Sequence, residues 1–452
     1  MSLAELAHRG GGQLHGPDIR FAGLSTDTRT LHTGDVYLAL TGARFDGNDF
    51  VAAAAESGAS GAIVSRHAQD VSLSQLVVGD THRTLGSIAA ANRERSEARV
   101  IALTGSQGKT TVKEMIGRIL ALGAHTLLTE ANLNNTIGVP LTLLRLTAEH
   151  RYAVIEMGAN AAGEIAFSAG ITRPDIALIT GASAAHIEGF GSLQGIVQAK
   201  GEILDRLTAD DKAILNADDA NVGAWVERAC RCPVVLFSLE NADGEAAYFA
   251  QGIQSNDRGQ VAFILHTPHG SVEIGLSLLG RHSVMNAVAA AACAMEAGAG
   301  LADIKAGLEA MQAVKGRLSP MAGPAGSRLI DDTYNASPGS FKAAIDVMLS
   351  LPGERILVAG DMKELGPDSV SCHEEVGRYA RDAGVDELWA VGADSRHTVN
   401  AFGERGRHFG EQKELIEHCR ARAGESVIFL IKGSRGAQMD RVVSALQARG
   451  DA

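Results

Sequence analysis

One short segment, Thr104-Gly105-Ser106-Gln107-Gly108-Lys109-Thr110-Thr111, constrains the fold of this chain more than any other. It follows the apolar run 99–103 and precedes a helical pattern over 112–120, so a strand, a glycine-rich turn and a helix come in succession. Glycines let backbone N–H groups approach phosphates, and a helix start adds partial positive charge. The lysine of such a loop reaches terminal phosphates, and its threonine hydroxyl can bind Mg²⁺. The segment predicts a phosphate-binding loop of the short Gly-x-x-Gly-Lys-Thr form; the alternative is a strand-to-helix turn with an exposed lysine.

Short apolar runs alternate with helical segments along most of the chain, which predicts α/β domains with mainly parallel sheets. The predicted strands are 61–64, 75–78, 99–103, 152–156, 176–180, 213–216, 328–330, 356–359, 387–391 and 427–431. Between 234 and 280 polar and apolar residues alternate, which predicts an antiparallel, partly exposed region. We expect three domains: a small α/β substrate domain over 1–98, a central P-loop ATPase domain over 99–315 and a Rossmann-like α/β domain over 316–452.

Composition excludes several classes of protein. The net charge is −12 and basic residues do not cluster, so we expect no nucleic-acid partner. The 5 cysteines are scattered without a Cys-x-x-Cys pair, which argues against a disulfide scaffold and a structural zinc site. The first residues lack a signal-peptide pattern, and the Ala-rich stretch 284–301 contains Asn286 and Glu296, so it predicts a buried helix. We expect a cytoplasmic protein without stable membrane insertion.

Three further residues are candidates for the chemistry at the phosphate loop. Glu156 ends the predicted strand 152–156, where a carboxylate suits Mg²⁺, a cation that prefers oxygen ligands. His186 follows the strand 176–180, and Lys200 lies on a predicted helix. Each also has an ordinary interpretation: a solvated strand end for Glu156, a hydrogen-bonded loop residue for His186 and a surface side chain for Lys200.

Four other motifs, taken with the loop, give the chain a resemblance over essentially its whole length. They are Asn132–Leu141 (NLNNTIGVPL), Asp331–Pro338 (DDTYNASP), Ala359–Gly366 (AGDMKELG) and Ile431–Arg435 (IKGSR). Together the motifs resemble the Mur ligase family, the ATP-dependent amide-bond-forming enzymes of peptidoglycan synthesis. The phosphate loop alone is shared with folylpolyglutamate synthetases, so the other motifs carry the resemblance.

The resemblance implies roles for individual residues at an ATP and Mg²⁺ site. Glu156 and His186 would serve Mg²⁺, and Lys200 matches the carbamylated lysine of the family. A neutral amine captures CO₂, and the resulting carbamate is an anion able to support Mg²⁺. Catalysis would rest on Lys109, Glu156, His186 and Lys200, and the metal site on Thr110, Glu156, His186 and Lys200. ATP binding would involve Gly105, Ser106, Gln107, Gly108, Lys109, Thr110, Thr111, Asn286, Arg317 and Asp332; at Ser283 the family usually has Asn.

The resemblance also implies the substrates. D-Alanyl-D-alanine would be joined to the tripeptide carboxylate of UDP-N-acetylmuramoyl-tripeptide through an acyl phosphate, by a monomer, giving the pentapeptide, ADP and phosphate. The expected substrate-binding residues are Ser25, Thr26, Asp27, Thr28, Arg29, Phe45, Asp46, Gly47, Asn48, Asn134, Asn135, Tyr334, Asn335, Lys432 and Arg435. For Lys432 and Arg435 an exposed basic loop is the alternative.

Three other functions remain open. The chain could be another Mur-type or folylpolyglutamate-type ligase, a non-catalytic scaffold, or a nucleotide-controlled switch. A guanine-binding switch normally has Asn-Lys-x-Asp, and the nearest segment, Asn216-Ala217-Asp218-Asp219, lacks the lysine.

Overall fold

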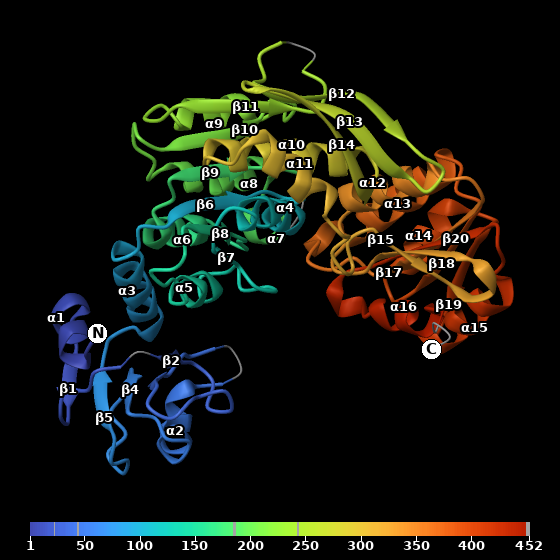
Figure 1. Ribbon diagram of the computed structural model, residues 1–452. Coiled ribbons are helices and arrows are strands. Elements are labelled where there is room, and N and C mark those ends of the chain that lie inside the picture. Colours follow the sequence, from blue (N-terminus) through green and yellow to red (C-terminus); the bar gives the residue numbers. More distant parts are fainter. Residues whose placement is uncertain (22, 43–44, 184–186, 242–243, 449–452) are drawn as a thin grey trace. The chain divides into compact units, whose positions relative to one another are not determined.

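The computed structural model describes residues 1–21, 23–42, 45–183, 187–241 and 244–448, and Figure 1 shows its elements. The chain forms two compact units. The first unit contains Met1–Ala98, Thr129–Glu149 and Gly170–Arg173; the second contains Arg99–Leu128, His150–Ala169 and the chain from Pro174 onward. The predicted limit at residue 98 is the end of the first segment of the first unit. The predicted limit at 315 lies within the second unit and stays a prediction.

The first unit is a small sheet covered by helices. Its strands lie in the order β1-β5-β4-β3-β2, with β1 antiparallel and the others parallel. The elements are α1 (Leu3–Gly10), β1 (Gln13–His15), β2 (Leu24–Ser25), β3 (Val36–Leu38), α2 (Val51–Glu56), β4 (Gly61–Val64), β5 (Ser74–Val77), α3 (Thr81–Glu94) and α5 (Gly138–Leu143). Ile137, Leu141 and Leu144 pack against its core, so the segment 129–149 completes this unit.

The second unit contains a large sheet in the order β14-β13-β12-β11-β10-β9-β6-β8-β7 (Figure 1). Its strands are β6 (Arg99–Thr104), β7 (Thr126–Leu128), β8 (Tyr152–Glu156), β9 (Ile176–Ile179), β10 (Lys212–Asn216), β11 (Val234–Ser238), β12 (Tyr248–Ser255), β13 (Gln260–Thr267) and β14 (Gly270–Leu279). The helices between and after them are α4 (Lys109–Ala121), α6 (Glu164–Thr172), α7 (Ile187–Phe190), α8 (Leu193–Gly201), α9 (Val222–Arg228), α10 (Arg281–Glu296) and α11 (Leu301–Glu309). Strand β6 therefore lies between β8 and β9, and its carboxyl end carries the glycine-rich loop.

The antiparallel region is shorter than the sequence pattern indicates. Strand β11 pairs in parallel with both β10 and β12, and within the described part of 234–280 the antiparallel pairs are β12–β13 and β13–β14. The expectation for 234–280 was thus wrong for β11, which is a run of four apolar residues followed by Ser238 and whose first three residues are half-buried. The Ala-rich α10 is buried along most of its length, as predicted. Among the described residues, no helix combines the length and the apolar character needed to cross a membrane.

A further sheet of the second unit has the order β15-β16-β20-β17-β18-β19, with only the β15–β16 pair antiparallel. Its elements are β15 (Ser319–Ala322), β16 (Arg328–Asp332), α12 (Pro338–Leu349), β17 (Glu354–Gly360), α13 (Ser369–Asp382), β18 (Glu387–Val391), α14 (Ser395–Phe402), β19 (Gly406–Phe409), α15 (Gln412–Arg422), β20 (Val427–Lys432) and α16 (Asp440–Leu446). Phe341, Val376 and Val399 of α12, α13 and α14 belong to one core cluster, and Leu415 and Val442 of α15 and α16 to another. Helices therefore cover both faces, as the doubly wound pattern predicts.

Candidate active site

The glycine-rich loop joins β6 to α4, and both of its glycines are needed for steric reasons. A Cβ at Gly105 would lie 1.9 Å from Thr180 Oγ1, and a Cβ at Gly108 would lie 2.4 Å from Asn286 Oδ1. Gly108 also has a φ of 80° where the helix begins. The predicted adenine-site residue Asn286 therefore lies directly against the loop, at the first turns of α10.

Lys109 and Thr110 begin α4 and lie beside Glu156. Lys109 Nζ donates to Gly105 O at 2.7 Å, and Thr110 Oγ1 donates to Glu156 Oε1 at 3.3 Å. Burial lowers the pKa of Lys109, opposed by the charge of Glu156. Glu156 is 1% exposed, so it is not the solvated strand end that the sequence left open. The parallel pairing of β6 with β8 places this carboxylate opposite Leu103, at the base of the loop.

Lys200, in the last turn of α8, is 7% exposed and is not a surface lysine. Burial, together with the positive charge of Lys109, lowers the pKa of Lys200 to about 7. At neutral pH a large fraction of such amines is uncharged, whereas an ordinary lysine with a pKa of ~10.4 is almost fully protonated. Carbamylation, which the resemblance implies for Lys200, requires this neutral form of the amine.

Arg317 connects the glycine-rich loop with the sheet that contains β16. Its Nη2 donates to Thr110 Oγ1 at 2.9 Å, and its guanidinium lies 4.2 Å from the centre of the Tyr334 ring. Arg317 Nε is buried and has no hydrogen-bond partner among the described residues. A buried guanidinium N–H without an acceptor suits an anionic ligand such as a phosphate. Arg435, which is exposed, lies over the same ring at 5.7 Å.

Asp332 and Lys432 form an ion pair at the carboxyl ends of the neighbouring strands β16 and β20. Lys432 is 1% exposed and also donates to Asn335 O at 3.0 Å, so the alternative of an exposed basic loop holds for Arg435 but not for Lys432. Asn335 Oδ1 accepts the backbone N–H of Ala336. The Lys432 ammonium is therefore already paired within the protein.

Sequence analysis did not find the residues that hold the loop after β9. This loop, Thr180–Ser183, makes several hydrogen bonds to the glycine-rich loop: Ser106 N to Gly181 O, Ser183 N to Ser106 Oγ, and Thr180 Oγ1 to Gln107 O at 2.7 Å. Asp219 Oδ2 accepts the N–H of Ala182 at 2.7 Å, and Asn216 Nδ2 donates to Thr180 O at 3.1 Å. The segment Asn216–Asp219 thus supports the phosphate loop and does not resemble a guanine-binding site. Its signal in the sequence was a polar cluster directly after a predicted strand.

His282, to which the sequence assigned no role, directly precedes Ser283, the position where the family usually has Asn. Burial lowers the pKa of His282, with Asp332 opposing and Lys432 reinforcing this effect. Ser283 Oγ donates to Leu279 O at 2.7 Å within the chain, which is a structural role.

Thr111 lies half-buried in the first turn of α4. His186 lies outside the described residues.

The remaining candidates belong to the first unit. Asp27 accepts hydrogen bonds from the backbone and side chain of Arg29, which lower the pKa of Asp27 to about 2, while Ser25 Oγ donates to Asp27 O. Thr26 and Thr28 are half-buried. Asp46 Oδ1 accepts from Asn48 and its Oδ2 from Arg66, which fixes this turn.

Gly47 packs against the backbone of Leu40, while the neighbouring ring of Phe45 is 57% exposed. Asn135 Oδ1 accepts the N–H of Gly138 at the start of α5, and Asn134 is half-buried. All of these candidates therefore lie in one compact unit, and the exposed Phe45 ring is available to a ligand.

The chain was compared with protein families, curated proteins and solved structures. Three family models match: "Mur ligase family, catalytic domain" over residues 20–118, "Mur ligase middle domain" over 103–294 and "Mur ligase, glutamate ligase domain" over 316–435. The UDP-N-acetylmuramoyl-tripeptide–D-alanyl-D-alanine ligase of Escherichia coli (strain K12) is 45% identical over 452 residues, which is 100% of this chain and 99% of that protein.

Two solved structures are similar over nearly the full length. A crystal structure of MurF from Acinetobacter baumannii is 38% identical, covers 98% of this chain and 97% of its own, and has a TM-score of 0.91. A MurF ligase from Thermotoga maritima in complex with ADP is 26% identical, covers 94% and 96%, and has a TM-score of 0.83. These structures confirm the predicted α/β fold class with mainly parallel sheets. Because family models match successive parts of the sequence and a relative of 45% identity spans all of it, the chain belongs to the Mur ligase family.

Proposed function

We propose that this protein is an ATP-dependent ligase that joins D-alanyl-D-alanine to the tripeptide carboxylate of UDP-N-acetylmuramoyl-tripeptide, giving the pentapeptide, ADP and phosphate. The observation that carries the proposal is the convergence of Lys109, Thr110, Glu156, Lys200 and Arg317 around the glycine-rich loop. The relative from E. coli, 45% identical over the full length, is named for this reaction.

The reaction follows from the low reactivity of a carboxylate towards amines. The carboxylate oxygen of the tripeptide attacks the γ-phosphorus of ATP, the bond to ADP breaks, and an acyl phosphate forms. The free amine of the dipeptide then attacks the acyl carbon, loses a proton, and displaces inorganic phosphate. Lys109 and Arg317 are cationic donors next to the loop, so they offset the negative charge on the transferred phosphoryl group.

The residues around Thr110 fit a bound Mg²⁺. The hydroxyl of Thr110 and the buried carboxylate of Glu156 are 3.3 Å apart, and oxygen donors of this kind are what Mg²⁺ takes. When bound, Mg²⁺ supplies charge neutralisation at the phosphates. Lys200 would contribute a carbamate: its neutral amine attacks CO₂, forms the N–C bond and releases a proton. The low pKa of Lys200 supports this role. His186 would be a further residue of the metal site.

The two units would divide the substrates between them. The first unit, with the turns Ser25–Arg29 and Phe45–Asn48 and the pair Asn134 and Asn135, is assigned to the UDP-sugar end. The second unit is assigned to ATP and to the dipeptide. Asn286 and Asp332 would bind the nucleoside, and Tyr334, Asn335, Lys432 and Arg435 would contact the acceptor side. Exposure of Phe45 and Arg435 supports their availability to ligands.

Phosphate release measured with each substrate omitted in turn tests the proposal. We expect release with ATP only when both UDP-N-acetylmuramoyl-tripeptide and D-alanyl-D-alanine are present, and the pentapeptide should appear in equal amount by mass spectrometry. Release with glycine or a single amino acid but not with the dipeptide would contradict the substrate assignment. ATP hydrolysis that requires neither the tripeptide substrate nor the dipeptide, or a preference for GTP, would favour a nucleotide-controlled switch.

A further inference from the structure

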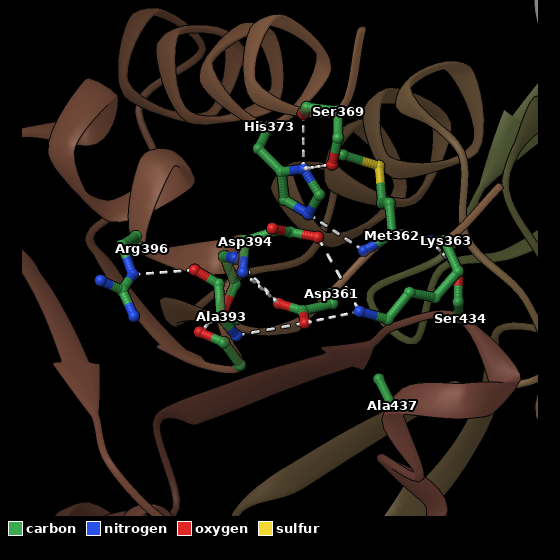
Figure 2. A network of polar contacts seen from close by, with 12 residues as sticks. Asp361, Met362, Lys363, Ser369, His373, Ala393, Asp394, Arg396, Ser434 and Ala437 are labelled. Carbon is green, nitrogen blue, oxygen red and sulfur yellow. Dashed lines mark hydrogen bonds and ion pairs between the residues drawn. The ribbon is translucent and has the colours of Figure 1, made fainter. Parts of the chain in front are cut away.

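Asp361 lies at the carboxyl end of β17 in a motif to which the proposed reaction assigns no role. Asp361 is buried, at 5% exposed, and Figure 2 shows it at the centre of a polar network. The carboxylate accepts backbone N–H groups of Ala393 at 3.2 Å, Asp394 at 3.1 Å and Ser395 at 2.9 Å. Asp394 and Ser395 are the N-cap and the first residue of α14, so Asp361 of one strand caps the helix that follows the neighbouring strand β18.

The same residue is bound to the loop that follows β20 on its other side. The 432–435 loop (Lys432–Arg435) begins at the end of that strand. Ser434 N donates to Asp361 O at 3.0 Å, and Lys363 N donates to Ser434 Oγ at 2.9 Å, a reciprocal pair of bonds between the two loops. Lys363 Nζ turns back to Asp361 Oδ2 at 3.0 Å, as Figure 2 shows. Asp361 therefore links the carboxyl ends of three adjacent strands: β18, β17 and β20.

The space around Asp361 leaves little freedom for adjustment. A Cβ at Gly392 would lie 2.2 Å from Asp361 Oδ1, and a Cβ at Gly433 would lie 3.2 Å from Gly360 Cα. His373 of α13 closes the network from the far side, where its Nε2 accepts Met362 N–H at 3.0 Å and its Nδ1–H donates to Ser369 O at 2.7 Å. The backbone on both sides of Asp361 is thus fixed by close contact.

The 432–435 loop carries residues that the proposed function places on the acceptor side. Ser434, held by Asp361 and Lys363, lies between Lys432, which is bonded to Asn335 O, and Arg435, which lies over the Tyr334 ring. Tyr334 in turn contacts Arg317, and Arg317 contacts Thr110 of the glycine-rich loop. A continuous set of contacts therefore runs from the phosphate loop to the segment that Asp361 holds.

We propose that Asp361 is a positioning residue that sets the place of the 432–435 loop, and so acts mainly on the use of the acceptor amine. The proposal rests on the proposed ligase function. In the wild type both carboxylate oxygens of Asp361 accept hydrogen bonds. In Asp361→Asn one oxygen is replaced by an NH₂ group, which cannot accept. That NH₂ group would face other donors, either those of Lys363 and Ala393 or the N–H groups at the start of α14. Ser434→Ala removes the acceptor of Lys363 N–H, together with a longer hydrogen bond from Ser434 Oγ to Ala336 O at 3.5 Å, and tests the same link from the loop side.

Asp386 provides a matched control on the same two strands. Its carboxylate accepts Arg355 N at 2.9 Å and Arg355 Nε at 3.1 Å, which joins β17 and β18 at their amino ends. Asp386→Asn therefore perturbs an aspartate that bridges the same strands at the opposite edge of the sheet. A general loss of stability would affect both variants, whereas a loss of positioning at the site would affect only Asp361→Asn.

The experiment measures kcat and KM for each substrate in the full-length protein and its Asp361→Asn, Ser434→Ala and Asp386→Asn variants, together with backbone hydrogen exchange. In the first two variants we expect kcat/KM for D-alanyl-D-alanine to fall roughly ten- to hundredfold, the range that misplaced reacting groups cause. The KM for ATP should stay within about twofold of the wild type, because a fixed phosphate loop keeps its affinity. Exchange should become faster at 392–396 and 432–436, and Asp386→Asn should resemble the wild type.

Equal kinetic effects of Asp361→Asn and Asp386→Asn, or a lower melting temperature with all kinetic constants unchanged, would overturn the proposal. An increase in the KM for ATP alone would do so too. If the wild-type protein does not use the dipeptide as a substrate, the proposed ligase function is contradicted instead. In that case hydrogen exchange at 432–436 still decides whether Asp361 holds the loop.

Discussion

At the scale of single residues, Lys200 shows how a protein can use burial to change the chemistry of a side chain. The amine lies near Lys109, and burial next to a second positive charge lowers its pKa to about 7. Burial of a lysine costs stability, because the charged form loses its hydration. A lysine buried beside a second positive charge is therefore better explained by a chemical role than by a contribution to folding.

Substitution of Lys200 tests that role. Lys200→Ala and Lys200→Arg should both lower kcat by roughly hundredfold or more, the loss typical when a charged group at a phosphoryl-transfer site is removed. The thermal transition of each variant should remain cooperative, which shows that the chain still folds and that the loss of kcat belongs to the site. Lys212→Arg is the control, because an arginine can keep the ion pair with Glu296. Full activity of Lys200→Arg, which cannot form a carbamate, would contradict the carbamate role.

At the scale of elements, two adjacent aspartates after β10 have different tasks. Asp219 accepts the N–H of Ala182 and so holds the loop that is bonded to the phosphate loop. Asp218 accepts from Ser238 Oγ and Leu239 N, at the end of β11. Asp219→Ala should raise the KM for ATP about tenfold, because a hydrogen bond to a charged group contributes ~1.5–3 kcal/mol. Asp218→Ala should lower the melting temperature and leave that KM unchanged; the reverse pattern in ATP titrations would contradict the assignment.

The sequence predicts most strands of the parallel sheets, because each is an apolar run bounded by turns, as in β8 and β20. It does not predict β2 or β7, which are too short to show a pattern. At the site, the glycine-rich motif predicts the positions of Lys109 and Thr110 from the sequence alone. The burial of Lys200 and the contact of Arg317 with Thr110 depend on residues far apart in the chain, so no local pattern carries them.

A second effect at the scale of elements is the pH dependence that His373 of α13 gives to stability. Its side chain is 1% exposed, and burial lowers the pKa of His373 below its usual ~6.5, opposed by Ser369 O, Asp361 and Asp394 and reinforced by His397. Above pH ~6.5 both the folded and the unfolded chain hold this histidine neutral. As the pH falls below that value, the unfolded chain binds the proton first, so the folded state loses stability.

Denaturant unfolding at several pH values tests this contribution. Between pH 7 and pH 5 the free energy of unfolding of the wild type should fall more steeply than that of His373→Gln, by up to about 1.4 kcal/mol per pH unit. His8→Gln changes an exposed histidine and should keep the slope of the wild type. Equal slopes for His373→Gln and the wild type would show that the proton is bound equally by both states.

At the scale of the whole molecule, the chain does not divide into units in simple linear order. The segment 129–149 lies between β7 and β8 in the sequence, two strands of the second unit, but it belongs to the first unit. Leu141 of this segment packs against a core that contains Leu38, Ile63 and Leu76. Asn92 Nδ2 of α3 also donates to the carbonyl oxygens of Leu143 and Leu146. The stability of the sheet near the amino terminus therefore depends on residues that follow the phosphate loop in the sequence.

Leu141→Ala in the full-length chain should therefore weaken a sheet that lies more than sixty residues earlier. Since Leu141 is half-buried, we expect a loss of about 1–3 kcal/mol, below the larger values of fully buried leucines. Hydrogen exchange should become faster at β3, β4 and β5 but not at β6 or β17, because those strands belong to the second unit. Leu122→Ala, at an exposed leucine just after α4, is the control and should change neither set. Faster exchange in β6 with β3–β5 unaffected would mean that the segment 129–149 supports the second unit instead.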